Sequence, residues 1–461
     1  MKRTKRTVNK SNFVINGTST IREALVKIAN NKEGVVLLEN STGQIYALAT
    51  DGDIRSGFLN GHTVDSCIDD VANKNFFCGT PDTSREVLLK QLDGTIKFIP
   101  IIDDKGNFKS FLNKNSLPKK IESNVFYRSK APVRISFGGG GSDVSKYLND
   151  FSGAVINATI SLHSHASLKV KKSKKSIKIN SLDLNESIEF KDLNDLISHQ
   201  GRFSLINAVI KAINPTFGFD LFLRSDYPMS SGLGGSAVVA AVILGCFNQL
   251  RNDKWDMYEL AEMAFQAERI QLGIAGGWQD QYATVFGGFN FMEFNKNQNI
   301  IHPLRMPEDA IRELEESLIL CYTGLIHDSG EIHLDQSEQT KSTITKDKIQ
   351  KNVKLTYKIK DHLLKGQLHE LGDCLNEGWN IKKSLSNKIS NSALDDIYKK
   401  ALENGITGGK LLGAGGGGYY LFYVSPFKRH EAMKWIVKEG LVHTPFVFDN
   451  QGLQSWTVRE K

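Results

Sequence analysis

The segment SSGLGGS, residues 230–236, has the residue types and the spacing that could bind a polyphosphate. The strand-like segment FDLFLRS precedes it, and the long apolar segment AVVAAVILGCF follows it as a helix would. A helix begins with unpaired backbone N–H groups and the positive end of its dipole, and both attract an anion. The sequence therefore predicts either a phosphate site or a close contact between helix and strand at Ser230, Ser231, Gly232, Leu233, Gly234, Gly235 and Ser236.

Two common phosphate-binding motifs do not fit this loop. No G-K-[ST] follows the glycines, which excludes a Walker loop. The run GLGGSA fits G-x-G-x-x-G only if Ala237 replaces the last glycine. No βαβ unit follows with an acidic residue about 20 positions further on, as a dinucleotide site requires.

Two further glycine-rich segments lie on either side of this loop in the sequence. In APVRISFGGGGSDV, residues 131–144, a strand-like run ends in four consecutive glycines, which lose much backbone entropy on ordering. The segment GGKLLGAGGGGYYLFYV, residues 408–424, ends in another strand-like run. By itself it could form a tight hairpin between two buried strands. The three segments together are more specific than any one of them.

In this order and spacing, the motifs A-P-x-R-x-x-x-x-G-G-G-x-D, P-x-S-S-G-L-G-G-S-A and G-A-G-G-G-G resemble those of the GHMP kinases, over about residues 127–461. The resemblance implies a two-lobed α+β fold in which ATP lies against residues 230–236. It implies that Asp143 accepts hydrogen bonds from sugar hydroxyls. The substrate-binding residues implied are Gly139, Gly140, Gly141, Ser142, Asp143, Gly415 and Gly416.

Phosphoryl transfer needs a positioned hydroxyl, a metal ion on the phosphates and cations near the developing charge. The resemblance implies that Asp280 is the base and that Arg134 pairs with it and stabilises the transferring group. It also implies that Ser236 and Glu268 hold the Mg²⁺ of MgATP. Simpler roles are open as well: Asp280 could cap a helix, Arg134 could form a structural ion pair, and Glu268 could pair with Arg269.

Within the family, the chain is most similar to the bacterial D-glycero-D-manno-heptose 7-phosphate kinases, in GAVINATI, GGWQDQYATVFGGFNFMEF, HPLRM and the W-x-x-K-K of residues 379–383. This implies phosphorylation of an anomeric hydroxyl to a 1,7-bisphosphate for surface-carbohydrate synthesis. Lys382 and Lys383 would bind the phosphate that the sugar already carries, or they are a solvated helix pair. Gly235 departs from the family, which usually has a second Ser there. The alternatives are a kinase for a free sugar such as fucose or galactose, and a catalytically silent sugar or nucleotide sensor.

The first 118 residues contain a helix–strand–turn–strand unit twice. The spacing and the phrase ATDGDIR resemble a CBS-domain pair, a regulatory module that often binds adenine nucleotides and often dimerises. The resemblance implies that Thr50 and Asp53 contact the nucleotide and predicts a homodimer; alternatively, the two residues only cap a helix. The second repeat has LNKNSL at the matching place, without the acidic residue. The polar residues 119–126 are the predicted linker to a kinase domain over residues 127–461.

Composition excludes several classes of protein. The 461 residues are 40% hydrophobic and 24% charged, with a net charge of +7, which is mild for this length and gives no support for nucleic-acid binding. The five cysteines are scattered without a C-x-x-C pair, so neither a metal site nor a disulfide framework is expected. Neither a secretory signal nor an apolar run long enough for a membrane is present, which predicts a cytoplasmic protein.

Overall fold

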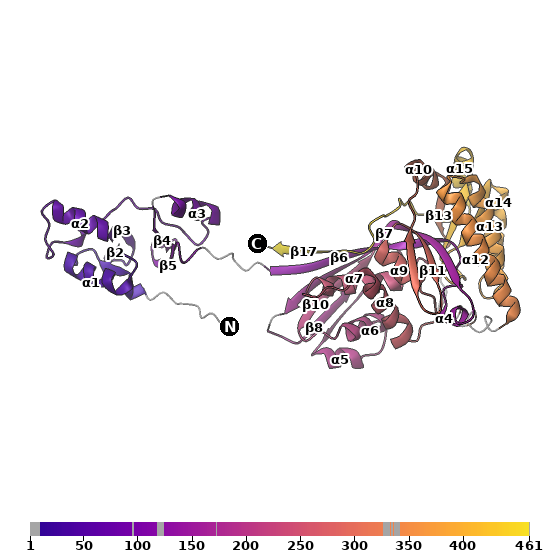
Figure 1. Ribbon diagram of the computed structural model, residues 1–461, viewed down its shortest axis with the longest axis horizontal. Coiled ribbons are helices and arrows are strands. Elements are labelled where there is room, and N and C mark those ends of the chain that lie inside the picture. The colour runs from indigo at the N-terminus through magenta and orange to yellow at the C-terminus, as the bar shows by residue number, and fades with distance from the viewer. Residues whose placement is uncertain are drawn as a thin grey trace. The chain divides into compact units, whose positions relative to one another are not determined.

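The structure is a computed structural model that describes residues 10–94, 96–117, 124–171, 173–325, 332, 335 and 342–460. The chain divides into two compact units, Met1–Glu122 and Ser123–Lys461, which Figure 1 shows in indigo to purple and in purple to yellow. Of the predicted linker, residues 119–126, residues 119–123 lie outside the described residues. Residues 124–126, also predicted as linker, belong instead to strand β6 (Asn124–Gly138), because they pair with a strand from the end of the chain.

The first unit is built from two similar pieces. Strand β1 runs parallel to β2, which pairs antiparallel with β3, and β4 forms a hairpin with β5. Gly79 pairs in parallel with Ile101 of β4, as β1 does with β2. The helix–strand–turn–strand order predicted from the sequence therefore occurs twice. The elements are η1 (Lys10–Asn12), β1 (Val14–Asn16), α1 (Ile21–Asn31), β2 (Val35–Glu39), β3 (Ile45–Thr50), α2 (Asp51–Leu59), η2 (Ile68–Asp70), α3 (Arg85–Asp93), β4 (Phe98–Ile102) and β5 (Phe108–Asn113).

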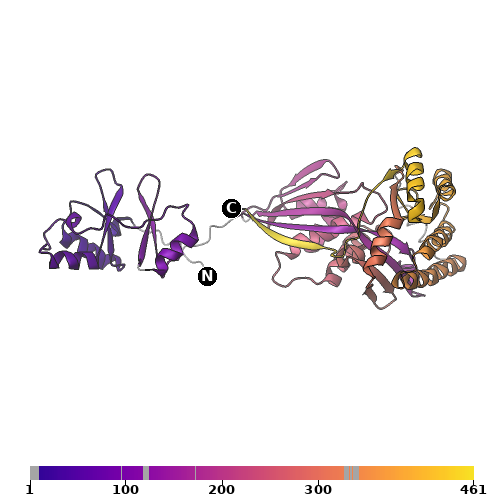
Figure 2. The same ribbon diagram turned by 90° about the horizontal axis from the view of Figure 1, so that it is seen from above.

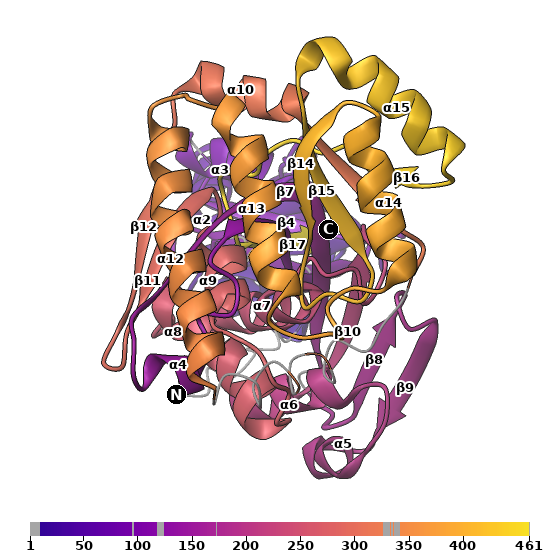
Figure 3. The ribbon, with the colours of Figure 1, turned by 90° about the vertical axis from the view of Figure 1, so that its right-hand side faces the viewer.

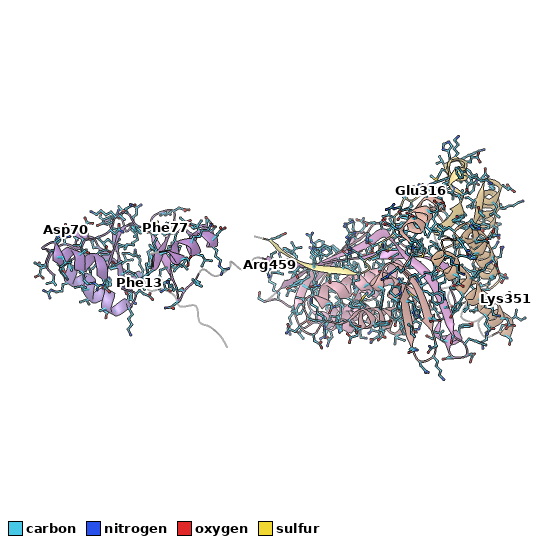
Figure 4. All side chains as sticks on the ribbon, turned by 45° about the horizontal axis from the view of Figure 1, so that its top comes forward. Phe13, Asp70, Phe77, Glu316, Lys351 and Arg459 are labelled. Atoms are coloured by element: carbon cyan, nitrogen blue, oxygen red, sulfur yellow. The ribbon has the colours of Figure 1, made fainter. Side chains whose placement is uncertain are left out.

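Aromatic side chains join the two pieces of this unit. Phe13, labelled in Figure 4, packs against Phe98 of β4 with ring centroids 6.2 Å apart and against Phe111 of β5 at 4.9 Å. Val14, Leu37 and other apolar residues of the first piece complete the cluster. Burial of this apolar surface is what holds the two repeats together.

The second unit contains a large sheet organised around one long strand, β7. It pairs antiparallel with β6, β10 and β11, and β6 also pairs with the last strand, β17. Figure 2 shows the long β6 and β7 with the yellow β17 beside them. The strands are β6 (Asn124–Gly138), β7 (Gly153–Lys171), β8 (Ile177–Ser181), β9 (Glu186–Phe190), β10 (Gly218–Ser225), β11 (Phe289–Phe294), β12 (Asn299–Pro303) and β17 (Gln454–Glu460).

One helix, α7 (Gly235–Asn248), is apolar on all sides because it is buried on all sides. It packs on β6 and β7 of the sheet and also contacts α6, α8 and α9. The end of the loop that joins α7 is thereby anchored in the unit. The other helices of this part are α4 (Ser145–Leu148), α5 (Leu193–Ser198), α6 (Ser204–Ile213), α8 (Met257–Phe265), the π-helical turn η3 (Gln266–Gln271) and α9 (Gln279–Phe286).

A smaller four-stranded sheet, in the order β14-β15-β13-β16, forms the rest of the unit. In Figure 3, α13 and α14 lie on either side of its β14–β15 hairpin, and α12 lies beside α13. Two sheets, each with its own helices, correspond to the two-lobed α+β prediction. None of the helices in the described ranges is long and apolar enough to cross a membrane. The elements are α10 (Glu308–Ser317), β13 (Leu318–Tyr322), α12 (Thr343–Leu364), α13 (His369–Lys383), α14 (Ser392–Glu403), β14 (Ile406–Leu411), β15 (Tyr419–Val424), η4 (Pro426–Lys428), α15 (Arg429–Lys438) and β16 (Val442–His443).

Candidate active site

The loop between β10 and α7 has the strand–loop–helix geometry that the sequence predicts. Its backbone is left-handed at Ser230, Gly232 and Gly234, with φ of 55°, 81° and 81°, and Gly234 is the N-cap of α7. A Cβ on Gly232 would lie 2.8 Å from the Leu412 carbonyl oxygen. Glycine is therefore required at this point both by conformation and by the close approach of the third glycine segment.

The structure gives a physical reason for glycine at position 235, where the similar family usually has a serine. A Cβ there would meet the ring of Tyr227 at 2.7 Å. This tyrosine is held in place because its hydroxyl hydrogen-bonds the Ser164 hydroxyl at 2.6 Å. A serine at position 235 would have to displace this buried ring, which explains the glycine. The hydroxyl groups of the loop are therefore those of Ser230, Ser231 and Ser236.

A cavity of about 850 Å³ opens in front of this loop. It combines apolar side chains such as Leu205 and Met229 with polar groups at the loop and the ends of neighbouring elements. An apolar recess beside a glycine loop at a helix N-terminus suits a purine base carrying phosphates. The lining residues include Ser230, Ser231, Gly232, Gly234, Gly235, Ser236, Arg134, Glu268, Arg269, Asp280 and Gly413.

Arg134 and Asp280 form a two-point ion pair at the inner end of this cavity. Arg134 Nε and Nη2 each donate to a carboxylate oxygen of Asp280 at 2.8 Å, and Nη1 donates to the Gly232 carbonyl at 2.8 Å. Asp280 lies in the first turn of α9, but the N-cap is Trp278, so Asp280 does not cap the helix. Arg134 thus fixes Asp280 against the phosphate loop, with planar geometry that a lysine could not reproduce.

Glu268 and Ser236 meet next to the loop. The Ser236 hydroxyl donates to Glu268, and Gln281 Nε2 donates to the other carboxylate oxygen at 2.7 Å. Glu268 is only 1% exposed, and the π-helical turn η3 directs it inward. Arg269 Nη1 lies 3.5 Å from Glu268 Oε1, so the predicted ion pair between Glu268 and Arg269 is also present. A carboxylate and a hydroxyl beside a phosphate site are oxygen ligands that suit Mg²⁺, with phosphate oxygens and waters completing the shell.

A second, more enclosed cavity shares the Arg134–Asp280 pair with the first. Gly140, Gly141 and Asp143 line it, as do Arg269 and several residues of the smaller lobe. The Asp143 carboxylate accepts hydrogen bonds from the backbone N–H of Gln279 at 3.0 Å and of Gly141 at 3.3 Å. Its burial, opposed by the bond from Gln279, raises the pKa of the Asp143 carboxyl. A ligand hydroxyl entering this cavity would find a carboxylate already fixed in position.

Comparison with known proteins explains this pairing of cavities. The models of the GHMP kinases N terminal domain and the GHMP kinases C terminal match residues 203–288 and 359–432. The chain is 34% identical over 345 residues to the D-glycero-alpha-D-manno-heptose 7-phosphate kinase of Campylobacter jejuni, a match covering 72% of this chain and 99% of that protein. The chain belongs to the GHMP kinases. It is an ATP-dependent sugar kinase of this family.

Solved structures agree with this assignment. A crystal structure of a D-glycero-D-manno-heptose 1-phosphate kinase from Bacteroides thetaiotaomicron is 30% identical, with a TM-score of 0.60 over 72% of this chain and 100% of that chain. A putative sugar kinase from Campylobacter jejuni is 32% identical, with a TM-score of 0.57 over 74% and 100%. Lactococcus lactis galactokinase, at 19% identity and a TM-score of 0.57, shares the fold.

Several residues predicted to bind substrate make contacts within the fold of this kinase, and their binding role stays a prediction. Gly139 allows the chain to pass the Ala154 carbonyl, which a Cβ would approach to 1.9 Å. The Ser142 hydroxyl is buried and donates to the carbonyls of Gly139 and Ala154 at 2.8 and 3.0 Å. Gly416 donates its N–H to Ile389 at 2.8 Å, and Gly415 packs against the same residue.

The third glycine segment, residues 408–424, forms the hairpin between two buried strands that the sequence allowed. It also closes on the phosphate loop, because Tyr419 donates its N–H to the Ser231 carbonyl at 3.2 Å. The residue that this hairpin brings to both cavities is Gly413. The predicted positions Gly415 and Gly416 lie just beyond it.

The two lysines predicted to bind a substrate phosphate point in different directions. Lys382 lines the second cavity, which we call the acceptor cavity after the function proposed below. Its Nζ donates to the carbonyls of Gly413 and Leu411 at 2.6 and 3.1 Å. Lys383 Nζ instead pairs with Asp395 of α14 at 3.1 Å. Neighbouring positions of a helix face different ways, so the structure brings only one of this pair to the site.

Sequence reasoning missed Lys410 and gave Arg269 only a minor part. Lys410 belongs to β14 and is 6% exposed in the acceptor cavity. Burial, together with the charge of Arg134, lowers the pKa of Lys410 to about 7. Arg269 lines both cavities and donates to the Ala275 carbonyl at 3.0 Å. A lysine inside the otherwise apolar and glycine-rich strand ITGGKL was the signal that could have identified Lys410.

In the first unit, Thr50 and Asp53 close a capping box at the start of α2. Asp53 donates its N–H to the Thr50 hydroxyl at 3.2 Å, and Thr50 donates its N–H to the Asp53 carboxylate at 2.8 Å. The Thr50 hydroxyl also donates to that carboxylate at 2.6 Å. The helix-capping interpretation of these two residues therefore describes what their side chains do in the structure.

Proposed function

We propose that this kinase transfers the γ-phosphoryl group of ATP to the anomeric hydroxyl of D-glycero-D-manno-heptose 7-phosphate, giving the 1,7-bisphosphate and ADP for the synthesis of nucleotide-activated heptose. The observation that carries the proposal is the Arg134–Asp280 pair at the boundary of two cavities, one beside a phosphate loop and one with a fixed carboxylate. The acceptor is inferred from the 34% identical heptose 7-phosphate kinase.

On the nucleotide side, the chain supplies a preformed anion site. The N–H groups at the start of α7 and the hydroxyls of Ser230, Ser231 and Ser236 surround the place of the phosphates. Glu268 and Ser236 would hold Mg²⁺, which neutralises and orients the β- and γ-phosphates when it is bound. Because these groups are fixed before ATP binds, little reorganisation is needed during the reaction.

On the acceptor side, the Asp143 carboxylate would orient a sugar hydroxyl, and the Gly140 and Gly141 backbone lets the sugar approach. The acceptor oxygen forms a bond to the γ-phosphorus while the bond from phosphorus to the bridging oxygen of ADP breaks, and the electron pair leaves with ADP. Asp280 takes the hydroxyl proton. Arg134 keeps Asp280 in place and stabilises charge on the transferring group.

One observation favours a second candidate, a kinase for a free sugar. Lys383 pairs with Asp395 and lies outside the cavity, so only one of the two lysines predicted for a resident phosphate is available to it. The third candidate, a silent sensor, lacks such support, because Arg134, Asp280, Ser236 and Glu268 meet in one place. A chain without turnover would have no use for all four.

The test measures ATP consumption by the full chain with Mg²⁺ and four acceptors: heptose 7-phosphate, mannose, fucose and galactose. The proposal expects kcat/KM to be at least about 100-fold higher with heptose 7-phosphate than with any free sugar, because a missing charged group costs several kcal/mol of binding. Equal or faster turnover of a free sugar would refute the proposed acceptor and would support the second candidate.

For the first unit, we propose a CBS-domain pair that binds an adenine nucleotide at Thr50 and Asp53, promotes a homodimer and regulates a cytoplasmic enzyme. The repeated fold of this unit supports the proposal. Isothermal titration with AMP on the full chain, compared with the Asp53→Ala variant, tests it, and light scattering gives the oligomeric state. Equal AMP affinity in both proteins would remove the nucleotide site from these residues.

A further inference from the structure

The acceptor cavity contains two lysines, the buried Lys410 and the half-buried Lys382, that form no ion pair with an acidic side chain of the described residues. Lys382 Nζ is bonded to two carbonyl oxygens. Lys410 is only 6% exposed, yet its Nζ forms no hydrogen bond or ion pair with the described residues. Arg134 shares the cavity but is already paired with Asp280. Of the four cations that line this cavity, Arg134 is paired with Asp280 and Arg269 lies near Glu268, whereas Lys382 and Lys410 have no acidic partner among the described residues.

Such an arrangement destabilises the folded protein in the absence of a ligand. Burial, and then the charge of Arg134, lowers the pKa of Lys410 to about 7. Burial, and then the charges of Lys410 and Arg134, lowers the pKa of Lys382 well below its usual range. Each charge disfavours the others until an anion arrives. A ligand with several negative oxygens would satisfy both lysines at once.

The lining of the two cavities shows where that anion would be. Arg134, Arg269, Asp280 and Gly413 line both cavities and so mark the boundary that the phosphoryl group crosses. Both lysines line the acceptor cavity. They do not line the cavity in front of residues 230–236, which we call the nucleotide cavity. Their charges are coupled to Arg134, which holds the proposed base. They therefore lie on the acceptor side of the Arg134–Asp280 pair.

We propose that Lys410, together with Lys382, is a further catalytic residue that binds the phosphoryl group as this group becomes attached to the acceptor oxygen. The inference rests on the proposed function only in placing the acceptor in this cavity. As the new oxygen–phosphorus bond forms and the bond to ADP breaks, the three outer oxygens of the transferring group carry negative charge. The ammonium groups donate hydrogen bonds to these oxygens, while the acceptor proton goes to Asp280.

Lys410 provides the cleaner test of the two. Lys382 also holds the carbonyls of Leu411 and Gly413, so its replacement would disturb the loop. Lys410→Met keeps most of the length and volume of the side chain and removes its charge and its N–H donors. Lys399→Met, on the exposed surface of α14, is the matched control because Lys399 lines neither cavity.

The experiment compares wild type, Lys410→Met and Lys399→Met in the full chain. It measures kcat and KM with the best acceptor of the sugar panel, the Kd of MgATP, and Tm. We expect Lys410→Met to lose about 100-fold in kcat, as for loss of one preorganised donor to a transition state. The Kd of MgATP should change less than about twofold, because Lys410 lies outside the nucleotide cavity. Tm should stay equal or rise, because an unpaired buried amine is replaced by an apolar group.

Three results would overturn the inference. A kcat within threefold of wild type would show that Lys410 does not act in the transition state. A raised KM for a phosphorylated sugar, with kcat unchanged, would place the lysine on the phosphate that the sugar already carries. A fall in Tm together with weaker ATP binding would assign it a structural role. If the best acceptor is a free sugar, the proposed substrate fails, yet the same comparison on that sugar still decides the role of Lys410.

Discussion

Two acidic motifs, one in each unit, use the same chemistry in opposite ways. In the first unit, Asp53 lies three positions after Thr50, and the two residues satisfy each other in a capping box. In the second unit, Asp280 lies far along the sequence from Arg134, and their pair borders two cavities. A short separation lets a carboxylate serve the local backbone, whereas a long one lets the fold present it to a ligand.

The difference shows that an acidic residue in a motif is not by itself evidence of a ligand site. The Asp53 carboxylate accepts from the backbone and hydroxyl of Thr50. Asp280 is held by an arginine that also binds the phosphate-loop carbonyl of Gly232. Only the second arrangement places the carboxylate at the boundary of two cavities. The predictions below test this contrast, and they begin with the largest expected effect.

Asp280→Asn should lower kcat by at least about 1,000-fold, because the amide cannot take the acceptor proton and loses the two-point pairing with Arg134. The Kd of MgATP should stay nearly unchanged. Steady-state kinetics and equilibrium ATP binding measure the two quantities. Asp396→Asn, on the exposed surface of α14, is the control. Retained turnover would show that Asp280 is not the base.

Glu268→Gln should lower kcat/KM for MgATP by about 10- to 100-fold at low Mg²⁺ and recover in part at high Mg²⁺, because an amide is a weaker ligand for a hard cation. Titration of Mg²⁺ at fixed ATP measures the shift, with the exposed Glu403→Gln as control. An unchanged Mg²⁺ dependence would leave Glu268 with a structural role beside Gln281.

The pH dependence should report Lys410. Its pKa of about 7 means that it is charged below this pH and neutral above it. Acceptor kcat/KM should therefore fall as pH rises from 7 to 9 in the wild type and be flatter in Lys410→Met. The other charged groups lining this cavity are Arg134 of β6, Lys382 of α13, Asp280 of α9, Arg269 of the π-helical turn and Asp143. Identical profiles in both proteins would assign the fall to one of these.

The same lowered pKa has a consequence for stability. Between about pH 7 and the usual range of lysine, the unfolded chain binds a proton at this side chain that the folded chain does not. The free energy of unfolding should therefore rise with pH in this window for the wild type, and rise less for Lys410→Met. Denaturant unfolding at pH 7 and pH 9 measures it.

Thr50→Ala should have the smallest effect, a loss of about 1 kcal/mol in the stability of the first unit, because one helix cap is removed. All five tryptophans lie in the second unit, at positions 255, 278, 379, 435 and 456. Tryptophan fluorescence should therefore show an unchanged transition, while circular dichroism shows an earlier one. Turnover of ATP without added AMP should stay unchanged. A shifted fluorescence transition would contradict the local role of the cap.

The sequence alone determined much of the local structure. The strand–loop–helix around residues 218–248 follows from apolar patterning and from glycines at a helix start. The two repeats of the first unit follow from their period, because each is a short unit with its own turn. The proposed catalytic pair, Arg134 and Asp280, was predicted from the resemblance to the GHMP kinases that the three glycine-rich motifs carry.

Tertiary structure decided which neighbouring residue reaches the site. Lys382 and Lys383 are adjacent in sequence, yet helix geometry sends one into the cavity and the other to Asp395. The sequence marked Lys410 only as a lysine in a glycine-rich strand. Its place in the site follows from the tertiary structure, because α13 and β14 meet at the same cavity. Glycine at position 235 is explained by the Tyr227 ring, which only the tertiary structure brings beside it. Sequence patterns report contacts between near neighbours, whereas burial and charge coupling arise from segments that meet only after the chain has folded.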